Sequence, residues 1–216
     1  PTRRSSDLVQ LIPGKTTTTI LISDAINGKR KELVTSPLKE WLLSWVQPKT
    51  IYAQTKASGT VEGYLYKIDT TEKKMRRVLG NIRGLTTSIS PSGLYILYSE
   101  STNTGFLTKI FNTKTGSVQV LDIPILPEKC VWLKNEDIIC AGGGVVPEGT
   151  YPDVWYAGLA SFSDQLFHIY TKNNVFDIIY KNTQESFDMT QLQIDESRNL
   201  LFFIDKTTGY LWQVSL

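Results

Sequence analysis

The sequence predicts an all-β fold built from repeated units of four strands, and three observations lead to this prediction. Short runs rich in β-branched and aromatic residues alternate with turns of Gly, Pro, Asn and Asp, which is typical of strands. A polar turn between two apolar runs recurs at a regular spacing. The pattern Leu-x-x-Ile or Leu-x-x-Val, with an aromatic neighbour, follows each such turn, at residues 65–68, 107–110, 166–169 and 211–214.

The spacing of these repeats identifies the architecture. Leu65 lies 42 positions before Leu107, and a four-stranded unit of ~40 to 45 residues is the blade of a β-propeller. Helical repeats are disfavoured by the Gly and Pro punctuation and by the scarcity of segments with helical periodicity. A β-sandwich is the structural alternative, but it would not explain a register shared by four units.

The first residues are interpreted as foreign to the protein. Residues 1–8 read PTRRSSDL, which resembles the in-frame translation of a common sequencing adapter, so we expect a scar rather than native chain. A short basic N-terminal tail is the alternative. If the segment is a scar, the native chain begins upstream of it.

The remaining elements follow in order. Residues 9–36 form a partial blade, and whole blades are expected at about 37–80, 81–124 and 125–181. The last blade, 182–216, stops after its third strand. About four to five blades are therefore visible, and propellers close with ~4 to 8 blades. A closed ring of five blades is one alternative, but because residues 1–8 are interpreted as a scar, we expect a larger propeller that is truncated at its first blades.

The strands differ in polarity according to their place in the blade. Apolar runs at 94–98 and 200–204 predict strands that are covered on both faces, whereas the more polar runs at 73–79 and 117–121 predict outer strands. Polar turns recur after the third strand, at 24–28, 69–73 and 112–116.

Two motifs relate these blades to known propellers. Residues 90–93 read Ser-Pro-Ser-Gly and residues 63–69 read Gly-Tyr-Leu-Tyr-Lys-Ile-Asp, which resemble the turn and strand end of TolB-like and WD-repeat-like propellers. The turn has Ser92 where that family carries Asp. No Trp-Asp dipeptide closes any blade, which disfavours a eukaryotic-type WD repeat.

Three further segments, 36–41, 126–132 and 151–159, resemble uncharacterised propeller proteins of uncultivated small-genome bacteria. That resemblance implies an N-terminal membrane anchor, not present in this chain, and a propeller on the cell surface or in a periplasm-like space. It implies an extracytoplasmic location and a bacterial, metagenomic origin, but no activity.

Cys130 and Cys140 lie on the two arms of one expected hairpin around Asn135. Directly opposed positions can bring β-carbons within reach of a disulfide, and the implied location is one where bridges persist. Two buried reduced thiols are the alternative. A metal site is not expected, because two Cys and one His do not supply four suitably spaced ligands.

One blade contains an insertion between its second and third strands. Trp132 lies 34 positions before Leu166, whereas the equivalent Trp45 lies 20 positions before Leu65. Loops on a rigid scaffold often bind ligands, so the candidate binding residues are within this insertion: Tyr151, Asp153, Trp155 and Tyr156. The alternative is that the loop folds back and its rings cover the edge of the blade.

Other classes of function find little support. The chain has 23 basic and 21 acidic residues, a balance too even for a nucleic-acid partner, and its basic clusters at 29–31 and 73–77 fall on expected edge strands. No Gly-x-Ser-x-Gly elbow occurs, and His168 lies inside a strand as a structural residue. No cofactor and no catalytic group are predicted.

We therefore expect a non-enzymatic binding or scaffold propeller, a monomer that presents loops to a protein, peptide or glycan partner. The alternative is the substrate-gating propeller of a prolyl-oligopeptidase-like peptidase whose catalytic domain lies outside this chain. A propeller hydrolase or lyase with a site in the central channel is the weakest hypothesis. The fold alone does not choose among these functions, because one scaffold supports unrelated functions.

Overall fold

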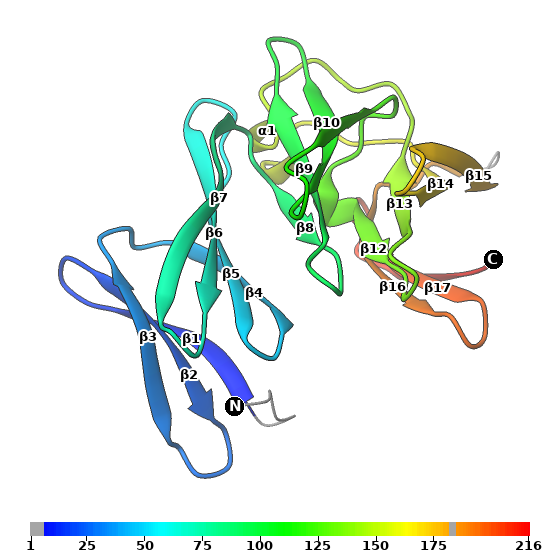
Figure 1. Ribbon diagram of the computed structural model, residues 1–216. Coiled ribbons are helices and arrows are strands. Elements are labelled where there is room, and N and C mark those ends of the chain that lie inside the picture. The colour runs from blue at the N-terminus through cyan, green and yellow to red at the C-terminus, as the bar shows by residue number, and fades with distance from the viewer. Residues whose placement is uncertain (1–6, 182–184) are drawn as a thin grey trace. The chain divides into compact units, whose positions relative to one another are not determined.

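The structure, a computed structural model, describes residues 7–181 and 185–216 and consists almost entirely of strands (Figure 1). Its described helical elements are the 3₁₀ turn η1 (Pro127–Lys129) and the short helix α1 (Asp153–Tyr156). The chain forms two compact units. The first holds residues up to Lys56 together with Gly63–Ile82, and the second holds Ala57–Glu62 and Arg83–Leu216.

The first unit contains two antiparallel sheets, in the orders β1-β2-β3 and β4-β5-β6-β7. The strands are β1 (Asp7–Pro13), β2 (Thr18–Asp24), β3 (Arg30–Ser36), β4 (Trp41–Gln47), β5 (Thr50–Thr55), β6 (Glu62–Asp69) and β7 (Lys74–Arg83). Asp7 and Leu8, which end the segment interpreted as a scar, pair with Asp24 and Ser23 in the first of these sheets.

The second unit contains three sheets, in the orders β8-β9-β10-β11, β12-β13-β14-β15 and β16-β17-β18. Their strands are β8 (Thr87–Ile89), β9 (Tyr95–Ser101), β10 (Phe106–Asn112), β11 (Val118–Leu121), β12 (Cys130–Trp132), β13 (Ile138–Gly142), β14 (Gln165–Tyr170), β15 (Val175–Tyr180), β16 (Met189–Asp195), β17 (Leu200–Asp205) and β18 (Leu211–Ser215). The predicted all-β class is confirmed.

The recurring turns after the third strands are closed by side chains that bind their own backbone. Asp69 Oδ1 accepts hydrogen bonds from the N–H groups of Thr71 and Glu72 at 2.7 and 2.8 Å. Asp24 and Asn112 make the same pair of contacts two and three residues further along the chain. Short polar side chains favour this turn, which explains their regular spacing in the sequence.

Two apolar cores fill the space between neighbouring sheets of the second unit. In β9, Ile96, Leu97 and Tyr98 are all buried, so this strand is covered on both faces as predicted. In β17, burial alternates, with Leu201 and Phe203 fully buried and their neighbours only partly so. The expectation of two covered faces is therefore wrong for β17, because the core between the sheets covers only one of them.

The two cysteines stand directly opposite each other on β12 and β13. Their Cα atoms are 4.1 Å apart and their sulfur atoms are joined in a disulfide. This bridge ties β12 to β13 immediately after η1.

Candidate functional site

The candidate site is the insertion, residues 143–164, which connects the end of β13 to the start of β14. The insertion folds back onto the second unit instead of projecting into solvent. Its apolar side chains pack with two residues from outside it in one buried cluster, made of Phe106, Leu126, Tyr151, Trp155, Ala160 and Phe162. Gly84 permits the close approach, because a Cβ at this position would lie 2.5 Å from the carbonyl oxygen of Tyr151.

Two of the four predicted binding residues therefore do not reach the surface. Tyr151 is 1% exposed and Trp155 is 4% exposed. The Tyr151 hydroxyl donates a hydrogen bond to the carbonyl oxygen of Pro147 at 2.8 Å. The expectation of a surface formed by all four residues is therefore wrong. Removing two large aromatic rings from water stabilises the folded chain, so these rings are buried. The alternative, in which the loop folds back and its rings cover the edge of the blade, describes Tyr151 and Trp155.

The other two predicted residues lie nearer to solvent. Asp153 is half-buried, and its Oδ2 accepts a hydrogen bond from the N–H of Gly59 at 2.5 Å. Tyr156 is 45% exposed, and its hydroxyl donates to Oε1 of Glu128. Tyr156 and the three exposed residues that follow it, 157–159, form what we call the tip of the insertion.

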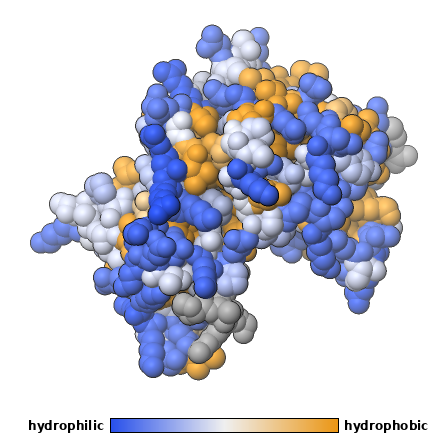
Figure 2. All heavy atoms as spheres, in the orientation of Figure 1, coloured by the Kyte–Doolittle hydropathy of each residue, from blue (hydrophilic) through white to orange (hydrophobic). Residues whose placement is uncertain are grey.

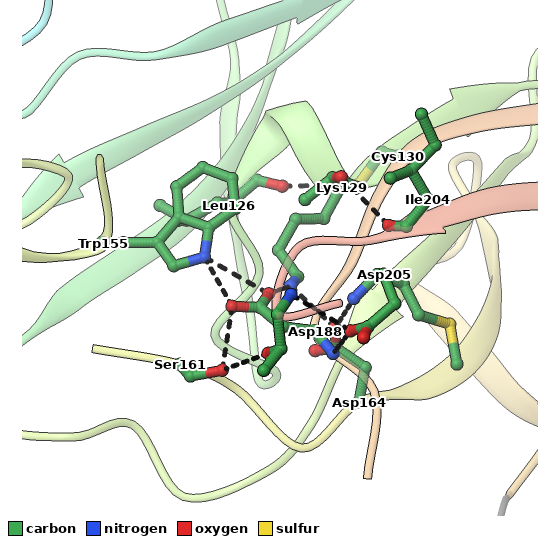
Figure 3. A network of polar contacts seen from close by, with 12 residues as sticks. Leu126, Lys129, Cys130, Trp155, Ser161, Asp164, Asp188, Ile204 and Asp205 are labelled. Atoms are coloured by element: carbon green, nitrogen blue, oxygen red, sulfur yellow. Dashed lines mark hydrogen bonds and ion pairs between the residues drawn. The ribbon is translucent and has the colours of Figure 1, made fainter. Parts of the chain in front are cut away.

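A buried ionic cluster fixes the insertion to the sheets beneath it (Figure 3). Its centre is the Lys129 ammonium, which lies between the carboxylates of Asp164 and Asp188. The Asp164 contact measures 2.6 Å, and all three side chains are at most 1% exposed. Trp155 donates its indole N–H to Asp188 Oδ2 at 2.9 Å. Burial of charge is tolerated only with such pairing.

The cluster joins segments that are far apart in the sequence. Lys129 precedes β12, Asp164 precedes β14 and Asp188 precedes β16. The Lys129 ammonium also lies 4.8 Å from the centre of the Phe162 ring, within the range of a cation–π contact. Asp188 donates its backbone N–H to Asp205 Oδ1 at 3.0 Å, so the end of β17 is tied to the same cluster.

No repeat or motif in the sequence predicts this cluster. The available signal is a lysine directly before the apolar run 130–133, where a buried charge needs a partner. The partners themselves come from loops with no periodicity, so their identity could not be read from a pattern.

The Asp164 carboxyl makes the stability of the protein depend on pH. Burial raises its pKa to about 6, although the charge and hydrogen bond of Lys129 act in the opposite direction. The folded state thus holds a proton in a range where the unfolded chain has released it. This carboxyl favours folding fully below its unfolded pKa of about 3.9, and the contribution is lost as the pH rises through the folded value.

We expect Asp164→Asn to remove this dependence. The unfolding free energy of the wild type minus that of the variant should fall between pH 4 and 6.5, by on the order of 2 kcal/mol, and stay level above that range. Urea unfolding at a series of pH values measures the difference. Asp122→Asn, at an exposed carboxyl, is the matched control for the same substitution outside the cluster; a level difference for Asp164→Asn would contradict the assignment.

Glu128 lies next to Lys129 but faces the tip. Burial raises the pKa of its carboxyl, and the hydrogen bond from the Tyr156 hydroxyl partly offsets the increase. Burial also raises the pKa of Tyr156, and the negative charges of Glu128 and Asp153 add to it. The tip is therefore a tyrosine flanked by two carboxyl groups.

The remaining candidates from the sequence have ordinary surroundings. His168 stacks on Tyr170 with ring centres 4.4 Å apart, and its Nε2 lies 3.6 Å from Asp137 Oδ2. Among residues 7–181 and 185–216, no group of three or more His, Cys, Asp or Glu is placed to hold a metal ion. In the same part of the chain, no helix has the length and apolar character needed to cross a membrane.

Comparison with known proteins gives the fold and nothing more specific. No protein-family model and no curated protein sequence matches the chain. The structure is similar to TolB from Acinetobacter baumannii, with a TM-score of 0.60 and 14% identity over 98% of this chain and 53% of that one. The chain thus spans about half the length of that structure.

Two similar structures belong to peptidases. The β-propeller domain of the Trilobed protease from Pyrococcus furiosus has a TM-score of 0.56 and 12% identity, over 97% of this chain and 65% of that one. The acylaminoacyl peptidase of Pyrococcus horikoshii has a TM-score of 0.62 and 13% identity, over 98% and 36%. Because all these identities are low, they show the fold alone, and the chain is a β-propeller of the architecture found in TolB and in peptidase propeller domains.

Proposed function

We propose that the chain belongs to a non-enzymatic propeller that binds a protein, peptide or glycan through the tip of its insertion. The observation that supports this proposal is the contrast within the insertion. Trp155 is held by the buried cluster, whereas the adjacent Tyr156 is exposed and Leu159 is 81% exposed. A loop held rigid in this way loses little conformational entropy when it binds, which strengthens association.

The location of the protein is part of the same proposal. We infer an extracytoplasmic propeller, bacterial in origin, that is anchored to the membrane by a segment outside this chain and acts as a monomer. The disulfide between Cys130 and Cys140 supports an oxidising compartment, because bridges of this kind are rare in the cytosol.

A second candidate function is the gating propeller of a peptidase. It is favoured by the similarity to the peptidase structures, of which this chain would form only one domain. The two functions differ in what the complete gene encodes. A hydrolase domain adjacent to the propeller supports the peptidase, whereas an apolar span before the propeller supports the anchored binding module.

A pull-down experiment tests the binding module. The immobilised chain should capture a partner from extracts of the source community, and Tyr156→Ala combined with Leu159→Ser should abolish the capture. Leu211→Ser, at a leucine that is 70% exposed on β18, is the matched control and should retain it. Equal capture by both variants would remove the tip from the proposal.

A further inference from the structure

The basic residues of this chain avoid the insertion completely. All 23 lysines and arginines lie outside residues 135–171, although this segment is about a sixth of the chain. The same segment contains five acidic residues, namely Glu136, Asp137, Glu148, Asp153 and Asp164. A protein whose total charge is close to neutral thus has one segment that is exclusively acidic.

Apolar side chains are exposed on the same insertion. Leu159 is 81% exposed, Tyr156 is 45% exposed and Val145 is 91% exposed. Figure 2 shows apolar residues at the surface beside hydrophilic ones on the face in view. Tyr156 and Leu159 belong to one turn of chain, in which the Leu159 N–H donates to the carbonyl oxygen of Val154. Exposed apolar residues gathered in this way are typical of an interaction surface.

The Asp153 carboxylate beside the tip is not paired with a cation of the protein. Within the described part of the chain, Asp153 forms no ion pair. The nearby Lys129 is fully engaged by Asp164 and Asp188. The Lys206 ammonium is the other cation at the insertion, 5.2 Å from the centre of the Trp155 ring.

Glu148 adds a second carboxylate, on the exposed side of the insertion. It is exposed to solvent, and the adjacent Gly149 packs against Val154, where an added Cβ would lie 2.8 Å from Val154 Cγ2. Val154 lies between Asp153 and Trp155, so Glu148 is on the same folded part of the insertion as the tip.

We propose that the tip and its carboxylates bind a cationic, apolar segment of a partner protein, one in which Lys or Arg alternates with Leu, Ile or Val. This inference rests on the proposed binding function and specifies the chemistry of the partner. Basic side chains pair with Asp153 and Glu148 and lie over the Tyr156 ring. Apolar side chains of the segment cover Leu159.

The same charge distribution argues against anionic partners. The carboxylates of the insertion repel a nucleic acid or an anionic lipid surface, because residues 135–171 contain no lysine or arginine that would offset their charge. An acidic peptide meets the same repulsion.

Fluorescence anisotropy with three short labelled peptides tests the proposal on the 216-residue chain. The first peptide alternates Lys with Leu, the second has Glu in place of Lys, and the third has Ser in place of Leu. We expect the first to bind, more tightly at low than at high salt, the second not to bind, and the third to bind at least about tenfold more weakly.

Variants of the chain assign the binding to the insertion. Glu148→Lys should weaken binding of the Lys-Leu peptide by about tenfold, as should Leu159→Ser. The matched controls are Glu32→Lys, at an exposed glutamate on β3, and Leu211→Ser on β18, which should bind like the wild type. Equal loss in the controls, or equal binding of the Glu-Leu peptide, overturns the proposal.

The outcomes separate this inference from the function on which it rests. If the tip variants abolish capture of a partner from extracts but the Lys-Leu peptide does not bind, the tip binds a partner and the cationic chemistry is wrong. If the peptide does not bind and capture does not depend on the tip, both proposals are wrong.

Discussion

Replacing Lys129 with Met should lower the free energy of unfolding by about 3–5 kcal/mol, because the substitution leaves two buried carboxylates facing each other without a cation. Asp164 and Asp188 are both within ion-pair distance of the Lys129 ammonium and are shielded from water. Met has nearly the length of the lysine stem, so little packing volume is lost. Urea-induced unfolding, followed by circular dichroism at neutral pH, measures the effect.

The control for this prediction is Lys134→Met. The Lys134 side chain is 85% exposed and its ammonium lies 4.0 Å from Glu196, and an exposed pair of this kind contributes at most about 1 kcal/mol. Adding Asp164→Asn to Lys129→Met should recover part of the loss, since one of the two carboxylates then becomes neutral. A loss below about 1 kcal/mol for Lys129→Met would show that the cluster does not stabilise the fold in the way described.

Replacing Trp155 with Ala should cost a similar amount, about 3–5 kcal/mol, through loss of a large buried ring. Trp155 is 4% exposed and packs against Tyr151, Phe162 and their neighbours in the insertion. The substitution also removes the indole N–H that donates to Asp188. Thermal unfolding should show a clear decrease in Tm, and the insertion should become more sensitive to limited proteolysis than the sheets.

Two matched variants divide this effect into its parts. Trp155→Phe keeps most of the ring volume and removes the hydrogen-bond donor, so it should cost less than Trp155→Ala. Tyr156→Ala should cost less than Trp155→Ala, about 1–2 kcal/mol, because the adjacent Tyr156 ring is 45% exposed and its main loss is the hydrogen bond to Glu128. If Tyr156→Ala destabilises the protein as strongly as Trp155→Ala, the assignment of one ring to the core and the other to the surface is incorrect.

The sequence was sufficient for the sheets because they depend on local rules. Each recurring turn is closed by one polar side chain, which accepts hydrogen bonds from N–H groups two and three residues further along; these residues are Asp24, Asp69 and Asn112. Their spacing in the sequence therefore marks where one strand ends and the next begins. The two cysteines could likewise be placed on the two arms of one hairpin from the polar turn between them, and the structure pairs them directly. The insertion was located by a difference in spacing between blades, without knowledge of its conformation.

The orientation of the insertion could not be predicted in the same way. Its residues follow no period of two or 3.6, so nothing in the order of Tyr151, Asp153, Trp155 and Tyr156 says which of them points inward. Their orientation is decided by groups that are distant in the sequence, chiefly Lys129 and Asp188. A single sequence does not report such contacts between residues far apart along the chain.

The way in which the insertion is held also limits how its length can change during evolution. Lys129 and Asp188 lie directly before the strands β12 and β16, whereas Asp164 and Trp155, which pair with them, belong to the insertion. In a homologue with a short connection between β13 and β14, a lysine and an aspartate at these positions would lack the insertion residues that pair with them and shield them from water. We therefore expect loop length and the residue types at positions 129 and 188 to vary together among homologues, with apolar residues at both positions where the loop is short.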